Sequence, residues 1–453
     1  MKKNIFPILL IALVFTMGFS GCKTGDKKSV VKMQQAEITL EDSLMNLVQY
    51  QTFQYFWDGA EPVSGMARER IHMDNVYPQN DQNVVTLGGS GFGVMAILVG
   101  IERGFITREQ ALERFQKIVD YLGKADRFHG AWPHWLDGPT GKVKPFSKKD
   151  DGGDLVETAF MIQGLLAVAE YYKDGNEAEQ QLVADIQQLW ETVEWDWYTQ
   201  GKDVLYWHWS PNYGWDMNFP VGGYNECLIM YVLAASSPTH SISPAVYDKG
   251  WALNGDIAKD TVYYGLSTVL NFYEHNDDPI GPLFWAHYSY LGLNPKGLTD
   301  KYADYWKLNV NHATIHYRYA LDNPKNYKGY GKNQWGFTSS YSMRGYAGHR
   351  PGKMDLGVIS PTAALSSFPY TPEQSMNFLK YLYLEADSLV GEYGPYDAYS
   401  QTGNWYLPRY LAIDQGPIPV MIENYRSGLL WNLFMKNEDV QAGLAKLGFT
   451  TDQ

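Results

Sequence analysis

The stretch DDGGDLVETAFMIQGLLAVAEYY, residues 150–172, decides the fold that the sequence predicts. Two aspartates and a Gly-Gly turn lead into a long apolar run, and residues 154–172 are expected to form a helix. Acidic residues suit the N-terminus of a helix because of its dipole. Asp154 and Glu157 lie three residues apart, so they share one helix face, with Asp150 in the loop before it. The stretch predicts a buried helix that begins in a cluster of carboxylates.

Helical patterns continue on both sides of this stretch. Thr107 to Gln110 form a predicted capping box, and Thr371, Pro372 and Gln374 predict a second helix start. Repeated strand alternation and a fixed-length repeat are both missing from the sequence. With shorter pieces at 84–102, 282–291 and 361–367 the count approaches twelve. The longer predicted helices are 41–57, 107–122, 154–172, 178–195, 226–235, 256–273, 299–321, 371–389 and 419–435.

This series of helices predicts an all-α fold, a single (α/α)6 barrel over residues 41–453. The alternative is two helical domains with a boundary near 236–244, SSPTHSISP. A Gly-rich segment at 88–93, GGSGFG, has the look of a phosphate loop but lacks the dinucleotide spacing and a preceding strand. We interpret it as a place where helices, or a helix and a ligand, approach closely.

Composition limits the classes of partner. The 453 residues carry 37 basic and 50 acidic side chains, for a net charge of −13, without a basic stripe. Nucleic acid is therefore excluded as an expected partner, and a polyanionic substrate is disfavoured. We expect a monomer without a cofactor. The sequence contains 15 Trp, 34 Tyr and 19 Phe, and for any one of them core packing is as good an explanation as a binding role.

The N-terminus predicts export. Lys2 and Lys3 precede an apolar run at 5–15, which is too short to span a membrane. Small residues then lead to Cys22, as in a bacterial lipoprotein signal; a plain secretory signal is the alternative. The sequence therefore predicts a signal peptide at 1–21, lipidation of Cys22 and a flexible tether at 22–40. The mature protein is expected in the cell envelope, in the periplasm or at the outer membrane, and touching the membrane only through its lipid.

Three acidic clusters could carry chemistry. The first is Asp150, Asp154 and Glu157. In the second, Glu226 stands between a Gly-rich loop and an apolar helix, where partial desolvation would raise the pKa of a carboxyl as a general acid requires. The third contains Asp414 and Glu423. Each has a simpler explanation, helix-end charges for the first two and a Glu423–Arg426 ion pair for the third.

Aromatic side chains accompany these acids in polar loops. Flat aromatic faces suit sugar rings, whose C–H faces are apolar while their hydroxyls need polar partners. A metal site is a weaker hypothesis: His312 and His316 have ligand spacing on a helix, but no glutamate of a HExxH motif lies between them, so we expect a packed pair and no metal. The tryptophans in question are Trp132, Trp135, Trp207, Trp209, Trp215 and Trp335, with His134 beside the first two.

The chain resembles the bacterial glycoamylase-like proteins, in particular glycoside hydrolase family 144, which acts on β-1,2-glucans. The resemblance runs through nearly the whole predicted mature chain. It rests on FQYFWDGAEPVSGMARER (53–70), DDGGDLVETAFMIQGLL (150–166), NYGWDMNFPVGGYNECLIMYVLA (212–234), NPKNYKGYGKNQWGFTSS (323–340), GVISPTAALSSFPYTPEQS (357–375) and AIDQGPIPVMIENYRSGLLW (412–431).

The resemblance implies an (α/α)6 barrel and an inverting hydrolase of β-1,2-linked glucose chains. Glu226 matches the general acid. Asp150, Asp154 and Glu157 match acids lining the cleft, among which the base or water-positioning groups are sought, and Asp414 stays a candidate base. We expect substrate contacts from Arg68, Trp132, His134, Trp207, Trp215, Trp335 and Glu423.

Two other classes of function stay open at this point. The first is a non-catalytic glycan-binding lipoprotein, which would not need converging carboxylates. The second is an (α/α)6 glycosidase for another glucan linkage. Neither internal cleavage nor the release of disaccharides from a chain end can be preferred from the residues, because that choice depends on the loops that close one side of the cleft.

Overall fold

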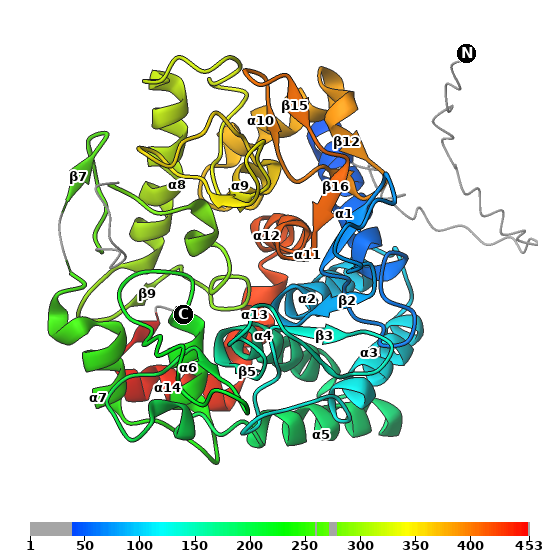
Figure 1. Cartoon of the computed structure of the whole chain (residues 1–453), viewed down its shortest axis with the longest axis vertical. Coiled ribbons are helices and arrows are strands. Elements are labelled where there is room, and N and C mark those ends of the chain that lie inside the picture. Colours follow the sequence, from blue (N-terminus) through cyan, green and yellow to red (C-terminus); the bar gives the residue numbers. More distant parts are fainter. Residues whose placement is uncertain (1–38, 259–260, 271–278, 452–453) are drawn as a thin grey trace, which may run out of the picture. The chain divides into compact units, whose positions relative to one another are not determined.

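The computed structural model describes residues 39–258, 261–270 and 279–451. Residues 40–453 form one compact unit, and the predicted signal peptide, Cys22 and nearly all of the predicted tether lie outside the described residues. Helices dominate this unit (Figure 1). They are α1 (Leu40–Trp57), α2 (Leu87–Glu102), α3 (Arg108–Leu122), α4 (Leu155–Tyr172), α5 (Glu177–Glu191), α6 (Leu228–Ser236), α7 (Pro244–Val246), α8 (Tyr305–Asp322), α9 (Pro361–Leu365), α10 (Pro372–Leu384), α11 (Ala412–Gln415), α12 (Pro417–Arg426), α13 (Leu429–Lys436) and α14 (Glu438–Leu447).

Short antiparallel strands join the ends of the helices, and none of those described exceeds three residues. The three-stranded sheet is β2 (Val84–Thr86), β3 (Trp135–Asp137) and β4 (Val143–Lys144). The pairs are β1 (Arg70–His72) with β16 (Arg409–Leu411), β5 (Gly153–Asp154) with β6 (His208–Trp209), β7 (Val262–Tyr263) with β8 (Leu266–Ser267), β9 (Leu298–Thr299) with β17 (Thr450–Thr451), β10 (Ser339–Ser340) with β11 (Ala347–Gly348), β12 (Val390–Gly391) with β13 (Gly394–Pro395), and β14 (Tyr399–Ser400) with β15 (Trp405–Tyr406). The fold is therefore all-α in class, as predicted.

Helices α2, α4 and α6 are buried over nearly their whole lengths. A helix that is apolar all round belongs in the core, and Figure 1 places α2 and α4 beside α12 and α13 in the middle of the unit. In contrast, α3 and α5 bury one stripe each and lie outside. Both outer helices begin with capping boxes, at Thr107 with Gln110, as predicted, and at Asn176 with Glu179.

Glycines let α2 and α4 pack at close range. A Cβ on Gly91 would lie 2.3 Å from the carbonyl oxygen of Phe160, and a Cβ on Gly164 would lie 2.3 Å from that of Gly91. Either contact is far inside van der Waals distance, so no larger residue fits without moving a helix. The close helix approach predicted for segment 88–93 is confirmed, and it draws the N-terminal ends of α2 and α4 together.

Several predicted helices differ from the structure. Segment 256–273 contains the β7–β8 hairpin, because Tyr264 and Gly265 both have positive φ, as a tight hairpin turn requires. The last predicted helix is split into α12 and α13 at Gly428, whose φ is +73°. Helix α10 ends at Leu384 and its Thr371 makes no capping bond, because the hydroxyl donates to the carbonyl of Ser367 instead.

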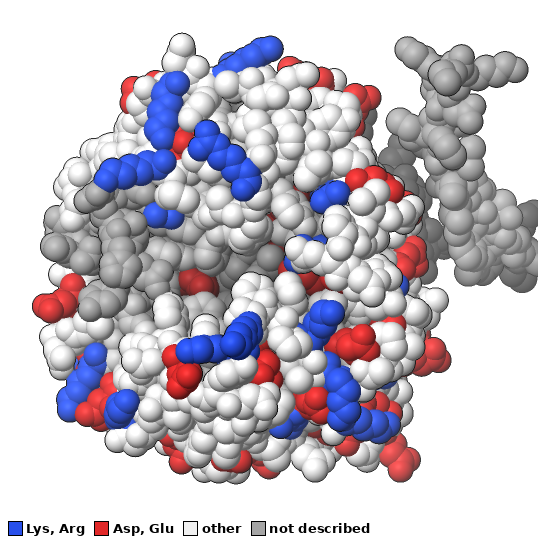
Figure 2. Space-filling view, in the orientation of Figure 1, with Lys and Arg blue, Asp and Glu red and all other residues white. Residues whose placement is uncertain are grey.

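No helix in the described part of the chain is both long enough and apolar enough to cross a membrane. Over the same part, the face drawn in Figure 2 mixes acidic with basic side chains and carries no continuous stripe of lysine and arginine.

Candidate active site

A cavity of about 380 Å³ opens where the N-terminal ends of α2 and α4 meet the segment before α6 and the loop entering α11. Carboxylates, one arginine and one histidine share it with a larger number of aromatic and aliphatic side chains. Such a mixture is typical of a small-molecule site. The lining residues are Glu69, Arg70, Gln79, Thr86, His134, Trp135, Phe146, Glu157, Phe160, Trp207, Glu226, Phe284, Tyr288, Ser339, Tyr341, Tyr346, Leu411 and Ile413.

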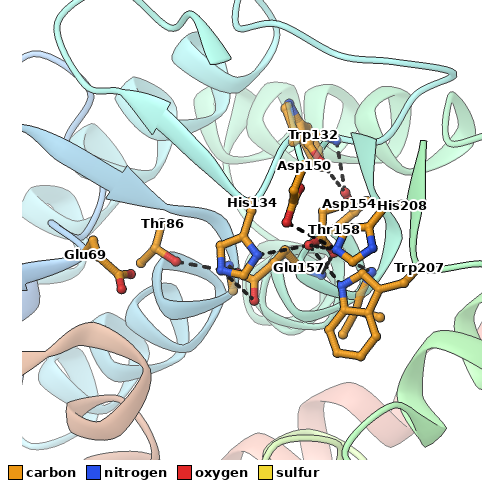
Figure 3. Close-up of polar contacts among 12 residues, drawn as sticks. Glu69, Thr86, Trp132, His134, Asp150, Asp154, Glu157, Thr158, Trp207 and His208 are labelled. Carbon is orange, nitrogen blue, oxygen red and sulfur yellow. Dashed lines mark hydrogen bonds and ion pairs between the residues drawn. The ribbon is translucent and has the colours of Figure 1, made fainter. Parts of the chain in front are cut away.

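Asp154 is the N-cap of α4 and organises the polar network in Figure 3. Its Oδ1 accepts hydrogen bonds from the backbone N–H groups of Val156 and Glu157, at 3.0 and 2.9 Å. Its Oδ2 accepts from the indole of Trp207 and lies against Nδ1 of His134, both at 3.0 Å. The side chain is fully buried. Although burial raises its pKa, the His134 hydrogen bond and the positive charges around it hold the pKa below the usual value.

His134 is held between carboxylates. Its Nε2 lies 3.9 Å from Oε1 of Glu157, opposite the contact with Asp154. Burial lowers the pKa of the imidazole, but the charge of Glu157 and the hydrogen bond to Asp154 outweigh it and raise the pKa to about 10. His134 is therefore an imidazolium at neutral pH, and both ring nitrogens act as donors.

Glu157 projects from the first turn of α4 into the cavity. Its Oε2 accepts a hydrogen bond from the backbone N–H of Gly88, in α2, at 2.6 Å, and a longer one from Thr86 at 3.5 Å. Burial, together with the charge of Asp154, raises the pKa of this carboxyl to about 7, against the opposing effect of His134. A carboxyl with a pKa near neutrality suits proton transfer.

The structure brings the predicted trio of Asp150, Asp154 and Glu157 together. His208, which we did not predict, completes the cluster: its Nε2 lies 3.3 Å from Asp150 and 3.6 Å from Asp154. Asp150 and Asp154 are buried and do not line the cavity, so only Glu157 of the trio faces it. The two aspartates hold the histidines and the tryptophan that surround the site.

Glu226 faces the same cavity, half-buried, two residues before the start of α6. Its backbone carbonyl accepts a hydrogen bond from the hydroxyl of Ser289, and the same hydroxyl accepts from the N–H of Ile229 at 3.0 Å. These contacts fix the start of α6 to the segment that carries Tyr288, another lining residue. Glu226, from the turn before α6, and Glu157, from the first turn of α4, thus reach one cavity.

Asp414, in α11, is buried beneath the cavity wall and does not line it. It lies against Asp397, which is also buried. Burial raises the pKa of Asp414 well above its usual value, and the neighbouring Asp397 raises it further. Burial likewise raises the pKa of Asp397 to about 6. Asp397 was not among the predicted residues.

The predicted aromatic contacts divide into cavity and core. Trp207 lines the cavity. Trp132 and Trp335 have no exposed surface and donate to the carbonyls of Leu122 and Gln374, so their expected role in substrate binding is wrong. Trp215 packs against Trp197, with ring centroids 4.8 Å apart, outside the cavity lining. The loops of Trp132 and Trp335 contain glycine and polar residues, but these two rings point inward.

Arg68 and Glu423 also lie outside the cavity. Arg68 donates to the side-chain oxygen of Asn83 at 2.9 Å and lines a separate, open cavity. Glu423 has 1% of its surface exposed and forms a two-bond ion pair with Arg103, at 2.6 and 2.5 Å. The pair that we considered for Glu423, with Arg426, is replaced by this contact. A role for either residue in contacting a ligand at the main cavity is not supported by its position.

Comparison with known proteins identifies the family. The family model Glycoamylase, described as "Putative glucoamylase", matches residues 218–438. The structure is similar to that of an endo-β-1,2-glucanase from Chitinophaga pinensis in complex with sophorotriose and glucose, with 64% identity, a TM-score of 0.90, and coverage of 91% of this chain and 99% of that one. The chain belongs to the glycoamylase-like family.

Two further relatives fit this glycoamylase-like assignment. An exo β-1,2-glucooligosaccharide sophorohydrolase from Parabacteroides distasonis is 45% identical over 429 residues; the match covers 90% of this chain and 58% of that protein, so this chain spans less than two thirds of its length. A Bacteroides caccae structure described as a "putative glucoamylase" is 59% identical, with a TM-score of 0.89 and coverage of 91% of this chain and 100% of that one.

Among the described residues of the glycoamylase-like chain, one group of three side chains could bring ligand atoms to a metal: His134, Asp150 and Asp154, within 4.8 Å of one another. Asp154 and Glu157 raise the pKa of His134 and so favour its protonated form, which has no free nitrogen lone pair for a metal. His312 and His316 each point Nε2 at the carbonyl oxygen of Gly281, at 2.9 Å, which makes them a hydrogen-bonded core pair.

Sequence reasoning missed four functional candidates of this glycoamylase-like site: Glu69, Arg70, His208 and Asp397. The first two belong to the quoted segment 53–70, from which only Arg68 was selected, and they face the cavity while Arg68 does not. His208 lies between Trp207 and Trp209 in a segment that was read for its aromatic rings. Asp397 stands alone between tyrosines, and no sequence signal connects it with Asp414.

Proposed function

We propose that this chain hydrolyses β-1,2-linked glucose chains by an inverting mechanism, with Glu226 as the general acid. One observation carries the proposal: Glu226, just before α6, and Glu157, in the first turn of α4, line one aromatic-walled cavity. The names of the relatives, an endo-β-1,2-glucanase and a sophorose-releasing enzyme, support the linkage. A glycan-binding protein without activity would not need a carboxyl with a pKa near neutrality in that cavity.

In this mechanism Glu226 donates its proton to the oxygen of the leaving sugar. A base on the other side of the ring takes a proton from water, whose oxygen forms the new bond to the anomeric carbon. Glu157 and Asp414 are the two candidates for the base. Glu157 lines the cavity directly, whereas Asp414 would act through a relayed proton because it lies behind the wall.

Substrate contacts are expected from the residues that line the cavity. Trp207 and Trp135 offer indole faces, and Arg70 offers a guanidinium whose Nη1 lies 3.3 Å from the Tyr341 hydroxyl. Phe146, which is 49% exposed, stacks on His134 with ring centroids 4.2 Å apart at the rim. Apolar C–H faces of glucose would lie on these rings while its hydroxyls meet the polar groups.

We also propose that the helices close into an (α/α)6 barrel. The division into wholly buried helices (α2, α4, α6) and outer helices with one buried stripe (α3, α5) supports two concentric layers. A fungal endo-β-1,2-glucanase from Talaromyces funiculosus, at 11% identity and a TM-score of 0.63, supports the same overall fold. An experimental structure tests it by the order of the helices around the axis.

For the N-terminus we propose export and lipidation at Cys22. The support is the basic pair, the apolar run and the small residues before the cysteine. Cys22→Ser is expected to leave the protein in the soluble envelope fraction, whereas the unaltered chain partitions with the membranes. Equal partitioning of the two would refute lipidation, and intracellular retention of both would refute export.

A product profile on linear β-1,2-glucan tests the main proposal. We expect sophorose or longer β-1,2-oligosaccharides from this substrate and none from β-1,3- or α-1,4-glucan. Glu226→Gln should abolish release with unchanged folding, and Asp216→Asn is the matched control because Asp216 belongs to the same segment and its side chain is 59% exposed. Full activity of Glu226→Gln would remove Glu226 from the acid role.

A further inference from the structure

Asp397 and Asp414 present three carboxylate oxygens with no hydrogen-bond donor. Both oxygens of Asp414 and Oδ1 of Asp397 are buried, and none receives a bond from an N–H or O–H group of the described residues. Only Oδ2 of Asp397 has a donor, the backbone N–H of Tyr341, at 2.8 Å. The two side chains are 5% and 2% exposed. Two ionised carboxylates in this arrangement would repel each other without water or a cation to separate them.

The groups around the pair do not supply the missing charge. Glu69, at the end of the segment before β1, adds negative potential at Asp414. Tyr288 and Tyr346 interact with it from two other segments, and burial raises the pKa of Tyr288, so that phenol carries no charge. The positive charge of Arg70 lowers the pKa of Asp397. This guanidinium also lies 3.3 Å from Glu69 and 3.3 Å from Asp81, so its single charge is divided among several acids.

We propose that Asp397 and Asp414 hold one proton between them and act as a single acid–base unit behind the cavity wall. One carboxyl is neutral and donates a hydrogen bond to the other. One oxygen of each residue then takes part in a hydrogen bond, and only one of the two negative charges remains. Asp397 is then a positioning residue: it holds Asp414 in contact through the shared proton, and the N–H of Tyr341 holds Asp397. Tyr341 itself lines the cavity, so the unit is connected to the place where the substrate binds.

The unit has a role in the reaction if the proposed glucan hydrolysis holds, and the proton balance is simple. The singly protonated pair accepts one proton from water, and the water oxygen bonds to the anomeric carbon. The glycosidic bond breaks, and Glu226 gives its proton to the leaving oxygen. The pair, now neutral, returns its extra proton to solvent, and Glu226 takes one up. The pair therefore starts and ends each turnover with one proton.

Infrared difference spectroscopy of the full chain at pH 6 tests the shared proton directly. Asp397→Asn and Asp414→Asn should each lose the same carbonyl band of one protonated carboxyl, because the amide then donates to the remaining carboxylate. The double variant should lose no more than either single variant. Asp151→Asn, whose buried carboxylate already has donors in Ser210 and Asn212, is the control and should lose nothing. Circular dichroism checks that each variant folds.

Three results would overturn the proposal: a band that persists in both single variants, a double variant that loses twice the area, or no such band in the unaltered protein. The rate profile on β-1,2-glucan gives a second readout. In Asp397→Asn the acidic limb of kcat/KM should move to higher pH, because an amide is a weaker donor to Asp414 than a carboxylic acid. An unmoved limb would exclude the catalytic role. A chain with no glucanase activity would refute the proposed function, while the infrared result would still decide the shared proton.

Discussion

Nδ1 of His134 lies 3.0 Å from Oδ2 of Asp154, and the opposite ring nitrogen lies 3.9 Å from Glu157. One cation therefore joins the carboxylate that caps α4 to the carboxylate that faces the cavity. The arrangement is built before any ligand arrives, because every member is held by backbone or side-chain contacts of its own (Figure 3). Preorganised charges of this kind need no rearrangement when a sugar binds.

His134 makes the stability of the folded protein depend on pH at alkaline values. Its pKa is about 10 in the folded chain and 6.5 in the unfolded reference, so folding binds a proton between these values. The contribution is complete below pH 6.5 and is lost as pH rises through 10. We expect the Tm of the unaltered protein to fall by several degrees over this window, more steeply than that of His134→Gln. Parallel curves from differential scanning calorimetry would contradict the prediction.

Trp207 and Trp335 are expected to respond differently to the same substitution. Trp207→Phe removes a hydrogen bond to a buried carboxylate beside the cavity, which is worth about 1.5–3 kcal/mol, so kcat/KM should fall at least about tenfold. Trp335→Phe removes a core hydrogen bond to a backbone carbonyl and should lower Tm while leaving KM unchanged. Steady-state kinetics and thermal melts of the two variants give the comparison. A raised KM in Trp335→Phe would return that residue to the site.

The ion pair between Arg103 and Glu423 is predicted to be structural. Glu423→Gln leaves Arg103 without its charged partner and should lower the free energy of unfolding by about 2 kcal/mol, since the arginine is partly exposed and recovers some hydration. The KM for glucan should not change. Glu41→Gln breaks the Lys380 pair at the surface and is the control, with no measurable effect on unfolding. Urea titration measures both.

The close approach of α2 and α4 makes Gly91 intolerant of any side chain. Gly91→Ala places a methyl group against the carbonyl of Phe160 and should cost about 3 kcal/mol, as overpacked cores do. Gly123→Ala is the matched control: it has right-handed backbone and 3.5 Å of clearance at the end of α3. Urea unfolding of the two variants should separate them clearly, and equal stability would mean that the helices can move apart.

The sequence predicts the helices best where a single element contains its own signal. The capping box at Thr107 and the apolar run of α4 are local, and both are present. The hairpin of β7 and β8 was missed because its turn depends on positive φ at Tyr264, and tyrosine is not one of the residue types that predict such a turn. The break at Gly428 was missed because the apolar spacing continues across it.

For the site, clusters of residues close together in the sequence were predictable, and contacts between residues from separate segments were not. Asp154 and Glu157 share one helix turn, so their proximity follows from the sequence. Asp397 and Asp414 meet only because a strand pair and α11 bring distant segments together. Burial was the other gap: Trp335 stands among glycine and polar residues, yet its ring is fully buried, since loops in this chain pack their aromatic residues inward.

The hydrogen bond from Gly88 to Glu157 joins two helices that the glycines allow to touch. The length of this bond consequently changes whenever the distance between α2 and α4 changes. Because this bond lowers the pKa of Glu157, any separation of α2 from α4 that lengthens the bond makes the carboxyl less acidic. The pKa of Glu157 therefore depends on the distance between the two helices.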